Sequence, residues 1–173
     1  HKFVSALSAT EKGKLMAVGS RTLEKAESFA RKYKAERWYG SYQQLINDED
    51  IDIVYISTPH NLHYELTKKC LEAGKNVLCE KPITINHFQF KELKELAKSK
   101  NLFYMDALWT RFLPHLKKVK EYIDNNKLGE IKVIRADFGI KPVYEPKGRL
   151  FNLELGGGSL LDIGIYPVFL ALT

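Results

Sequence analysis

The chain has 173 residues, about the length of one average domain. Hydrophobic residues make up 45% of the sequence and charged residues 28%, a balance that excludes disordered, collagen-like and disulfide-scaffold proteins. The longest nearly apolar run, Ile163 to Leu172, is interrupted by Gly164 and Pro167. This run is far shorter than the roughly 20 residues that span a bilayer, so we expect no membrane partner.

Basic residues outnumber acidic ones, with 27 Lys and Arg against 21 Asp and Glu, which raises the hypothesis of nucleic-acid binding. Most of this excess lies in predicted helices, as in residues 91–100 and 117–121, where the charges mix with glutamate and flank apolar positions. That arrangement is typical of the solvated face of a helix. We therefore expect no nucleic-acid partner.

Cys70 and Cys79 do not form a Cys-x-x-Cys pattern, so they indicate neither a disulfide framework nor a zinc site. We expect a reducing compartment, namely the cytoplasm. His60-x-x-His63 has the spacing of half a metal site, but no third ligand stands at a characteristic spacing. We favour a pocket histidine at a helix N-terminus and expect no bound metal.

Up to residue 106 the sequence alternates short apolar runs with amphipathic helices. Thr22 and Asn61 are candidate N-caps, Ser41-x-x-Gln44 is a capping box, and Gly74 stands where a helix ends. The pattern predicts, in order, helix 1–7, strand 15–19, a helix from 22, strand 37–39, a helix from 41, strand 52–57, helix 61–74, strand 76–79, helix 86–99 and strand 102–105. Apolar strands that alternate with helices indicate βαβ units, and hence a doubly wound parallel sheet of the α/β class.

After Asp106 the pattern changes. A predicted helix, 112–125, is followed by a run rich in β-branched residues, 130–140, and then by a loop, 141–150. Three glycines, 156–158, precede an apolar helix that continues to the last residue. We therefore expect an α/β domain over residues 1–108 and the start of a second, α+β domain over residues 109–173.

Polar residues follow three of the predicted strands: Ser20-Arg21, the segment 57–60, and Glu80-Lys81-Pro82. In a doubly wound sheet ligands bind beyond the carboxyl ends of the strands, so these residues are expected along one crevice, at a dinucleotide site. An arginine at this place accommodates a ribose 2′-phosphate, so Arg21 favours NADP over NAD. The alternative is a surface arginine that opens a helix.

Glu80-Lys81-Pro82 places a cation at the end of a strand. Pro82 restricts Lys81 to extended backbone, which directs the ammonium. Such a charge would stabilise an alkoxide and favour ionisation of a neighbouring acid in the oxidation of an alcohol. The alternative is an ordinary strand end at the surface.

Asp162-x-x-x-Tyr166 places two side chains on one face of the last predicted helix. The alternative is a packed tyrosine beside an exposed aspartate. The segment 109–112 combines Trp109 and Arg111 just past the last strand, as expected at a cofactor pocket or, alternatively, in an interdomain core. The triple glycine lacks the Gly-x-Gly-x-x-Gly spacing, so it indicates close approach of backbone rather than phosphate binding.

Together these motifs resemble the glucose-fructose oxidoreductase/inositol dehydrogenase family, over essentially the whole chain. The resemblance is carried by Glu80-Lys81-Pro82, by the helix end Leu71 to Val77 and by Gly156 to Gly164. Within the family, residues 109–112 and 162–166 are most similar to the dihydrodiol dehydrogenase branch.

The resemblance implies a Rossmann domain that binds NADP(H), followed by an α+β domain that holds the substrate and, in relatives, the dimer interface. It implies that Lys81 is the catalytic lysine and that Tyr166 is the general acid or base, with Asp162 orienting them. The residues expected to bind the cofactor are Ser20, Arg21, Ser57, Thr58, Pro59, Asn61, Glu80, Lys81, Trp109 and Arg111. Those expected to contact the substrate are His63, Trp109, Phe138 and Tyr166.

The family begins with a strand and a Gly-x-Gly-x-x-Gly turn, whereas this sequence starts inside the helix that follows them. We therefore expect a Rossmann-like sheet without its first strand, in a piece of a protein about twice as long. The leading hypothesis is an NADP-dependent dehydrogenase, a homodimer, that oxidises a trans-dihydrodiol or the anomeric hydroxyl of an aldose such as D-xylose. The alternative is a non-catalytic NADP-binding regulator.

Overall fold

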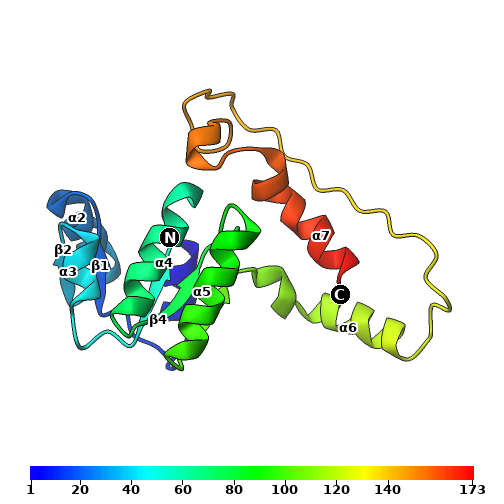
Figure 1. The fold of residues 1–173 in the computed structure, drawn as a ribbon, viewed down its shortest axis with the longest axis horizontal. Helices are drawn as coiled ribbons and strands as arrows, with labels where there is room; N and C mark the ends of the chain where they lie inside the picture. Colours follow the sequence, from blue (N-terminus) through cyan, green and yellow to red (C-terminus); the bar gives the residue numbers. More distant parts are fainter.

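The computed structural model describes residues 1–173. Up to residue 106 the elements are α1 (Lys2–Ser8), β1 (Ala17–Gly19), α2 (Leu23–Tyr33), β2 (Arg37–Tyr39), α3 (Tyr42–Ile46), β3 (Ile53–Ile56), η1 (His60–Leu62), α4 (His63–Glu72), β4 (Asn76–Cys79), α5 (His87–Ser99) and β5 (Tyr104–Asp106). The predicted alternation of helices and strands is confirmed, and Figure 1 shows these elements gathered in one lobe.

Local capping explains where several of these helices begin and end. The side chains of Ser41 and Asn86 each accept an N–H from the residue three positions later, as an N-cap does. Gly74 adopts φ +78° just after α4, a left-handed conformation that suits glycine. Two predicted caps differ: the Thr22 side chain accepts no cap hydrogen bond, and Asn61 lies inside η1, so that α4 begins two residues later.

All strand pairs are parallel, but they fall into two sheets, one of β1 and β2 and one with the order β3-β4-β5. A groove of about 790 Å³ lies between the two sheets. Apolar side chains from both sheets line it, among them Val18, Val54 and Ile56. The parallel pairing is confirmed, but the strands form two sheets rather than the single sheet that the sequence predicts.

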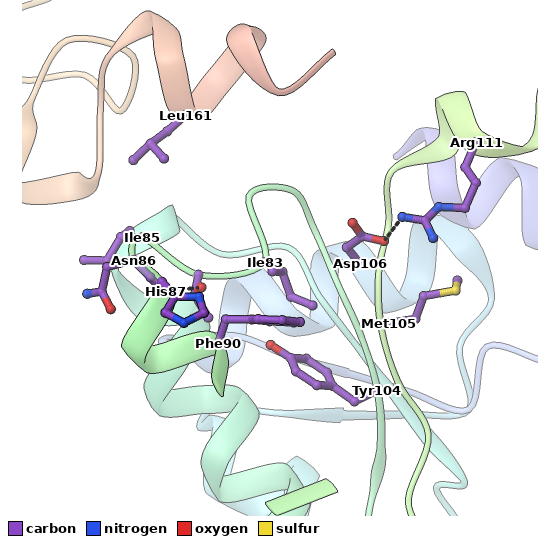
Figure 2. Close-up of a pocket in the computed structure, with 11 residues that line it drawn as sticks. Ile83, Ile85, Asn86, His87, Phe90, Tyr104, Met105, Asp106, Arg111 and Leu161 are labelled. Carbon is purple, nitrogen blue, oxygen red and sulfur yellow. Dashed lines mark hydrogen bonds and ion pairs between the residues drawn. The ribbon is translucent and has the colours of Figure 1, made fainter. Parts of the chain in front are cut away.

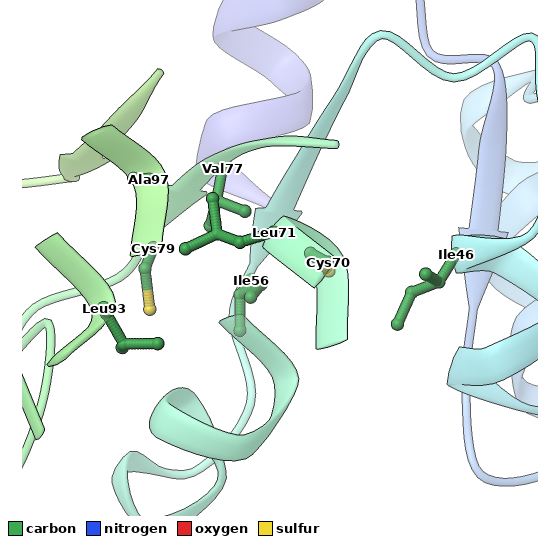
Figure 3. Close-up of a cluster of buried hydrophobic side chains, with 8 residues drawn as sticks. All are labelled: Ile46, Ile56, Cys70, Leu71, Val77, Cys79, Leu93 and Ala97. Atoms are coloured by element: carbon green, nitrogen blue, oxygen red, sulfur yellow. The ribbon is translucent and has the colours of Figure 1, made fainter. Parts of the chain in front are cut away.

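The core lies around β4, the middle strand of the larger sheet. Figure 3 shows the eight side chains of the buried cluster, which are Ile46, Ile56, Cys70, Leu71, Val77, Cys79, Leu93 and Ala97. They come from α3, β3, α4, β4 and α5, and α4 and α5 pack against each other. Burial raises the pKa of both cysteine thiols to about 12, so neither is a reactive thiolate.

Residues 107–173 form no strand. Their elements are η2 (Trp109–Phe112), α6 (Pro114–Asp124), η3 (Leu153–Leu155), η4 (Leu160–Gly164, a π-helical turn) and α7 (Ile165–Ala171). Residues 130–144 make no backbone–backbone hydrogen bond, and Figure 1 shows them as an extended segment between α6 and the last helices. The β-branched composition of residues 130–140 favours extended backbone, but a strand also needs a paired neighbour.

The segment Leu153–Ala171 is long enough and apolar enough to cross a membrane, by length and composition alone. This differs from the expectation that no such segment exists. That expectation rests on the apolar run from Ile163, whereas the segment begins at Leu153 and comprises η3, the three glycines, η4 and α7. The segment also carries Asp162, whose carboxylate is paired with two cations of the same chain.

Candidate active site

An ion pair joins the end of β4 to the last helical turns. Lys81 Nζ lies 3.0 Å from Asp162 Oδ1 and also donates to the main-chain carbonyl of Asp162. Both side chains are largely buried, with 14% of Lys81 and 9% of Asp162 exposed. The structure therefore brings together two residues that we predict to be catalytic, although they are far apart in the sequence.

A second cation, Arg149, contacts the same carboxylate. Its Nη1 lies 3.0 Å from Asp162 Oδ1. Burial alone would raise the pKa of the Asp162 carboxyl, but hydrogen bonds from Lys81 and Arg149 bring that pKa below its ordinary value. Asp162 is therefore held as a carboxylate between two positive charges.

The triple glycine holds the loop that carries Arg149. The N–H of Gly157 donates to Asn152 O at 2.9 Å, and the N–H of Gly158 donates to Leu150 O at 2.9 Å. A Cβ atom on Gly157 would lie 2.7 Å from Asn152 O and 2.9 Å from Arg149 O, closer than real Cβ contacts. This confirms that the glycines allow close backbone approach.

Gly156 links this loop to the end of β3. It has φ +75°, and its carbonyl oxygen lies 2.9 Å from Nδ1 of the buried His60. A Cβ atom here would lie 2.8 Å from the Cβ of His60. Burial lowers the pKa of His60, which favours the neutral ring.

Tyr166 lies against the ion pair and is surrounded by aromatic side chains. Lys81 Nζ is 5.4 Å from the centre of its ring. Trp109 Nε1 donates to the Tyr166 hydroxyl at 3.2 Å, and the rings of Phe138 and Tyr166 pack edge to face with their centres 5.0 Å apart. The structure thus gathers three of the residues we expect to contact substrate, while the roles assigned to them stay predictions.

His63, the fourth of those residues, is placed differently. It is fully buried; Nδ1 lies 2.7 Å from Pro82 O, and Nε2 lies 2.9 Å from Thr58 O. Carbonyl oxygens only accept, so both hydrogen bonds form together when each ring nitrogen carries a proton. In this structure His63 ties the loop after β3 to the loop after β4, and its contact with substrate stays a prediction.

Five of the predicted cofactor-binding residues line the groove between the two sheets, namely Ser20, Arg21, Ser57, Thr58 and Pro59. Thr58 Oγ1 is buried without a hydrogen-bond partner, and Asn61 Oδ1 is equally buried and unpartnered. Buried polar atoms are normally satisfied, so the Thr58 hydroxyl fits a ligand that carries hydrogen-bonding groups in the groove, whereas Asn61 does not line the groove. Arg21 is exposed beyond the end of β1. These residues fit a dinucleotide that lies across the strand ends.

Glu80 and Arg111 have other partners here. The hydroxyl of Tyr55 donates to the Glu80 carboxylate, and burial together with this bond raises the pKa of Tyr55. Arg111 Nη2 lies 3.6 Å from Asp106 Oδ1, and both residues line a separate pocket of about 490 Å³. Figure 2 shows this pair. The Glu80 carboxylate also accepts the main-chain N–H of Lys81 at 3.2 Å, and the expected cofactor contacts of Glu80 and Arg111 stay predictions.

Arg149 is the one residue of this cluster that sequence reasoning missed. It lies in an irregular loop without periodicity or a known motif. The one signal in the sequence was the triple glycine. It indicates that another backbone segment packs closely against the glycines, but it does not identify that segment.

The family is shown by comparison with known sequences. Residues 1–107 match the model of an oxidoreductase family with an NAD-binding Rossmann fold, and residues 116–173 match the GFO/IDH/MocA C-terminal domain. The chain therefore belongs to the GFO/IDH/MocA oxidoreductase family, which confirms the predicted resemblance. The domain boundary between residues 108 and 109 stays a prediction.

Among curated proteins, the chain is similar to trans-1,2-dihydrobenzene-1,2-diol dehydrogenases. It is 42% identical over 154 residues to that of Xenopus tropicalis, covering 89% of this chain and 46% of that protein. It is 39% identical over 170 residues to that of Danio rerio, covering 97% of this chain and 50% of that protein. The chain thus spans about half the length of the curated relatives it matches.

Among solved structures, the chain resembles a 3-ketoreductase from Actinomadura kijaniata in complex with NADP and TDP-benzene. The TM-score is 0.86 at 34% identity, over 95% of this chain and 50% of that one. The chain also resembles an aldose-aldose oxidoreductase from Caulobacter crescentus complexed with glycerol. The TM-score is 0.83 at 28% identity, over 97% of this chain and 51% of that one.

Proposed function

We propose that the whole protein is an NADP-dependent dehydrogenase that oxidises a trans-dihydrodiol or the anomeric hydroxyl of an aldose such as D-xylose. The observation that carries this proposal is the cluster of Lys81, Asp162 and Tyr166, with the ammonium 5.4 Å from the centre of the phenol ring. It combines a proton-transfer group with a charge that stabilises an oxyanion.

The bound nicotinamide supplies the hydride acceptor. Tyr166, in its ionised form, takes the proton of the substrate hydroxyl, and the N–H of Trp109 holds the phenolic oxygen in place. Lys81 stabilises the negative charge that develops on the substrate oxygen. Asp162 orients the ammonium through its carboxylate and its main-chain carbonyl.

NADP is proposed over NAD because Arg21 is exposed beyond β1, at the place where a ribose 2′-phosphate would lie. A dihydrodiol is favoured by the aromatic side chains of Trp109 and Phe138, which would pack on an apolar ring, and by the names of the curated relatives. An aldose is favoured by the likeness to a sugar oxidoreductase. A homodimer in the cytoplasm completes the proposal, and the two free, buried cysteines suit a reducing compartment.

The test uses the whole protein. NADPH and NADH are titrated separately, and trans-dihydrodiols and aldoses are then screened for NADP reduction. Lys81→Met should keep the NADPH affinity within a few fold and lower turnover by at least about 100-fold, the lower range for positioned acid–base catalysis. NADPH binding without any turnover would favour the non-catalytic regulator instead, and unchanged turnover in Lys81→Met would remove Lys81 from the mechanism.

A further inference from the structure

We propose that Arg149 is a positioning residue of this site, which shares the Asp162 carboxylate with Lys81 and keeps the cluster positively charged. The catalytic consequence of this role rests on the proposed function. The effect of Arg149 on Asp162 stands on the observed contacts alone.

Two cations share one carboxylate oxygen at Asp162. Lys81 and Arg149 each lie 3.0 Å from it. One carboxylate cannot neutralise two cations, so the cluster keeps an excess positive charge. The other titratable groups that face it are His60 and Tyr166: burial favours the neutral form of His60, and Tyr166 lies beside Lys81. No second carboxylate pairs with the side chain of either cation.

The fold holds the main chain of Arg149 firmly in place. The Arg149 carbonyl lies against Gly157 at a distance that excludes any side chain there, and the next residue's carbonyl accepts from Gly158. The loop is therefore fixed at two points beside Asp162. The side chain of Arg149 is 54% exposed, so its position beside Asp162 depends on this loop and on the ion pair.

Lys81 keeps one N–H group that Asp162 does not occupy. An ammonium has three N–H groups, and Asp162 accepts two of them. Because Arg149 also donates to the Asp162 carboxylate, that carboxylate neutralises the charge of Lys81 only in part. The third N–H stays available for a substrate oxygen, and the excess charge favours the alkoxide.

The test compares Arg149→Gln, which removes the charge, with Arg149→Lys, which keeps it. Arg31→Gln, in an exposed pair on α2, is the control for losing a surface arginine. First, the carboxyl of Asp162 is titrated by carbon NMR in cofactor-free whole protein. We expect its midpoint to rise in Arg149→Gln and to stay near the wild-type value in Arg149→Lys and Arg31→Gln.

Second, kcat and KM for alcohol oxidation are measured against pH. Removing a positive charge makes protons in the site harder to remove, so the pH of half-maximal kcat should rise in Arg149→Gln. We expect kcat at neutral pH to fall about 10-fold, equivalent to one pH unit, with KM nearly unchanged and with recovery in Arg149→Lys. If Arg149→Gln does not fold, Arg149→Met provides the same comparison, because it keeps an unbranched side chain.

The two proposals fail in different ways. If the wild-type protein turns over no alcohol, the proposed function fails, while the Asp162 titration still decides the role of Arg149. If Arg149→Gln leaves both the Asp162 midpoint and the pH profile unchanged, the Arg149 inference is overturned and the proposed function is untouched.

Discussion

Lys81 Nζ lies 5.4 Å from the centre of the Tyr166 ring, although the two residues come from the end of β4 and the start of α7. Two contacts hold them together: the ion pair of Lys81 with Asp162, and the hydrogen bond from Trp109 to the Tyr166 hydroxyl. The site is therefore assembled from both parts of the chain, and each of its groups can be tested separately.

Replacing Tyr166 with phenylalanine removes the hydroxyl and keeps the ring that packs on Phe138. If Tyr166 transfers the proton, turnover should fall by at least about 100-fold, while NADPH affinity stays within a few fold. Steady-state kinetics and NADPH titration measure both. The control is Tyr144→Phe, at an exposed tyrosine, and retained turnover in Tyr166→Phe would exclude the proposed proton transfer.

Replacing Gly157 with alanine should destabilise the protein. The new Cβ would meet Asn152 O at 2.7 Å and Arg149 O at 2.9 Å, and both are backbone atoms that cannot rotate away. We expect the free energy of unfolding to fall by about 1–3 kcal/mol or more, measured by urea denaturation. Gly139→Ala meets no atom within 4 Å and should stay within about 0.5 kcal/mol of wild type; equal effects would contradict the packing argument.

If Arg21 holds the ribose 2′-phosphate, replacing it with aspartate should shift the relative affinity from NADPH towards NADH. A carboxylate at this position repels a 2′-phosphate and accepts a hydrogen bond from a free ribose hydroxyl. The affinity for NADPH should fall at least about 10-fold relative to that for NADH, as measured by fluorescence titration of both. Lys32→Asp on α2 makes the same charge change at an exposed residue outside the groove. If the ratio of NADPH affinity to NADH affinity were unchanged in Arg21→Asp, Arg21 would not be a ligand of the 2′-phosphate.

The lowered pKa of Asp162 predicts a pH dependence of stability. An aspartate titrates at about pH 3.9 in the unfolded chain and at a lower pH in the folded protein. The stability that the carboxylate contributes is therefore present above about pH 3.9 and is lost as the pH falls through the folded value. Between about pH 5 and pH 3, urea denaturation should show a steeper loss for wild type than for Asp162→Asn. Parallel curves would show that Lys81 and Arg149 do not stabilise the charge.

Much of the fold follows from local patterns in the sequence. Apolar runs such as 76–79 and caps such as Ser41 are defined by neighbouring residues, so they could be predicted without tertiary information. The run 130–140 has a composition that favours a strand, but pairing depends on another segment that lies alongside, and none does here.

The site was only partly predictable. Strand ends placed Lys81 and Arg21 at one edge of the sheet, and the family resemblance added Asp162 and Tyr166. Arg149 could not be found, because its role depends on a tertiary contact of an irregular loop. The contacts of His63 are likewise tertiary, since the pattern could not show that both ring nitrogens meet main-chain oxygens.

His63 has a mechanical consequence for the protein. Its ring joins the main chain at Thr58, a residue that lines the groove, to the main chain at Pro82, the neighbour of Lys81. A shift of the loop after β3 would therefore act on the loop after β4 through the hydrogen bonds of this one imidazole.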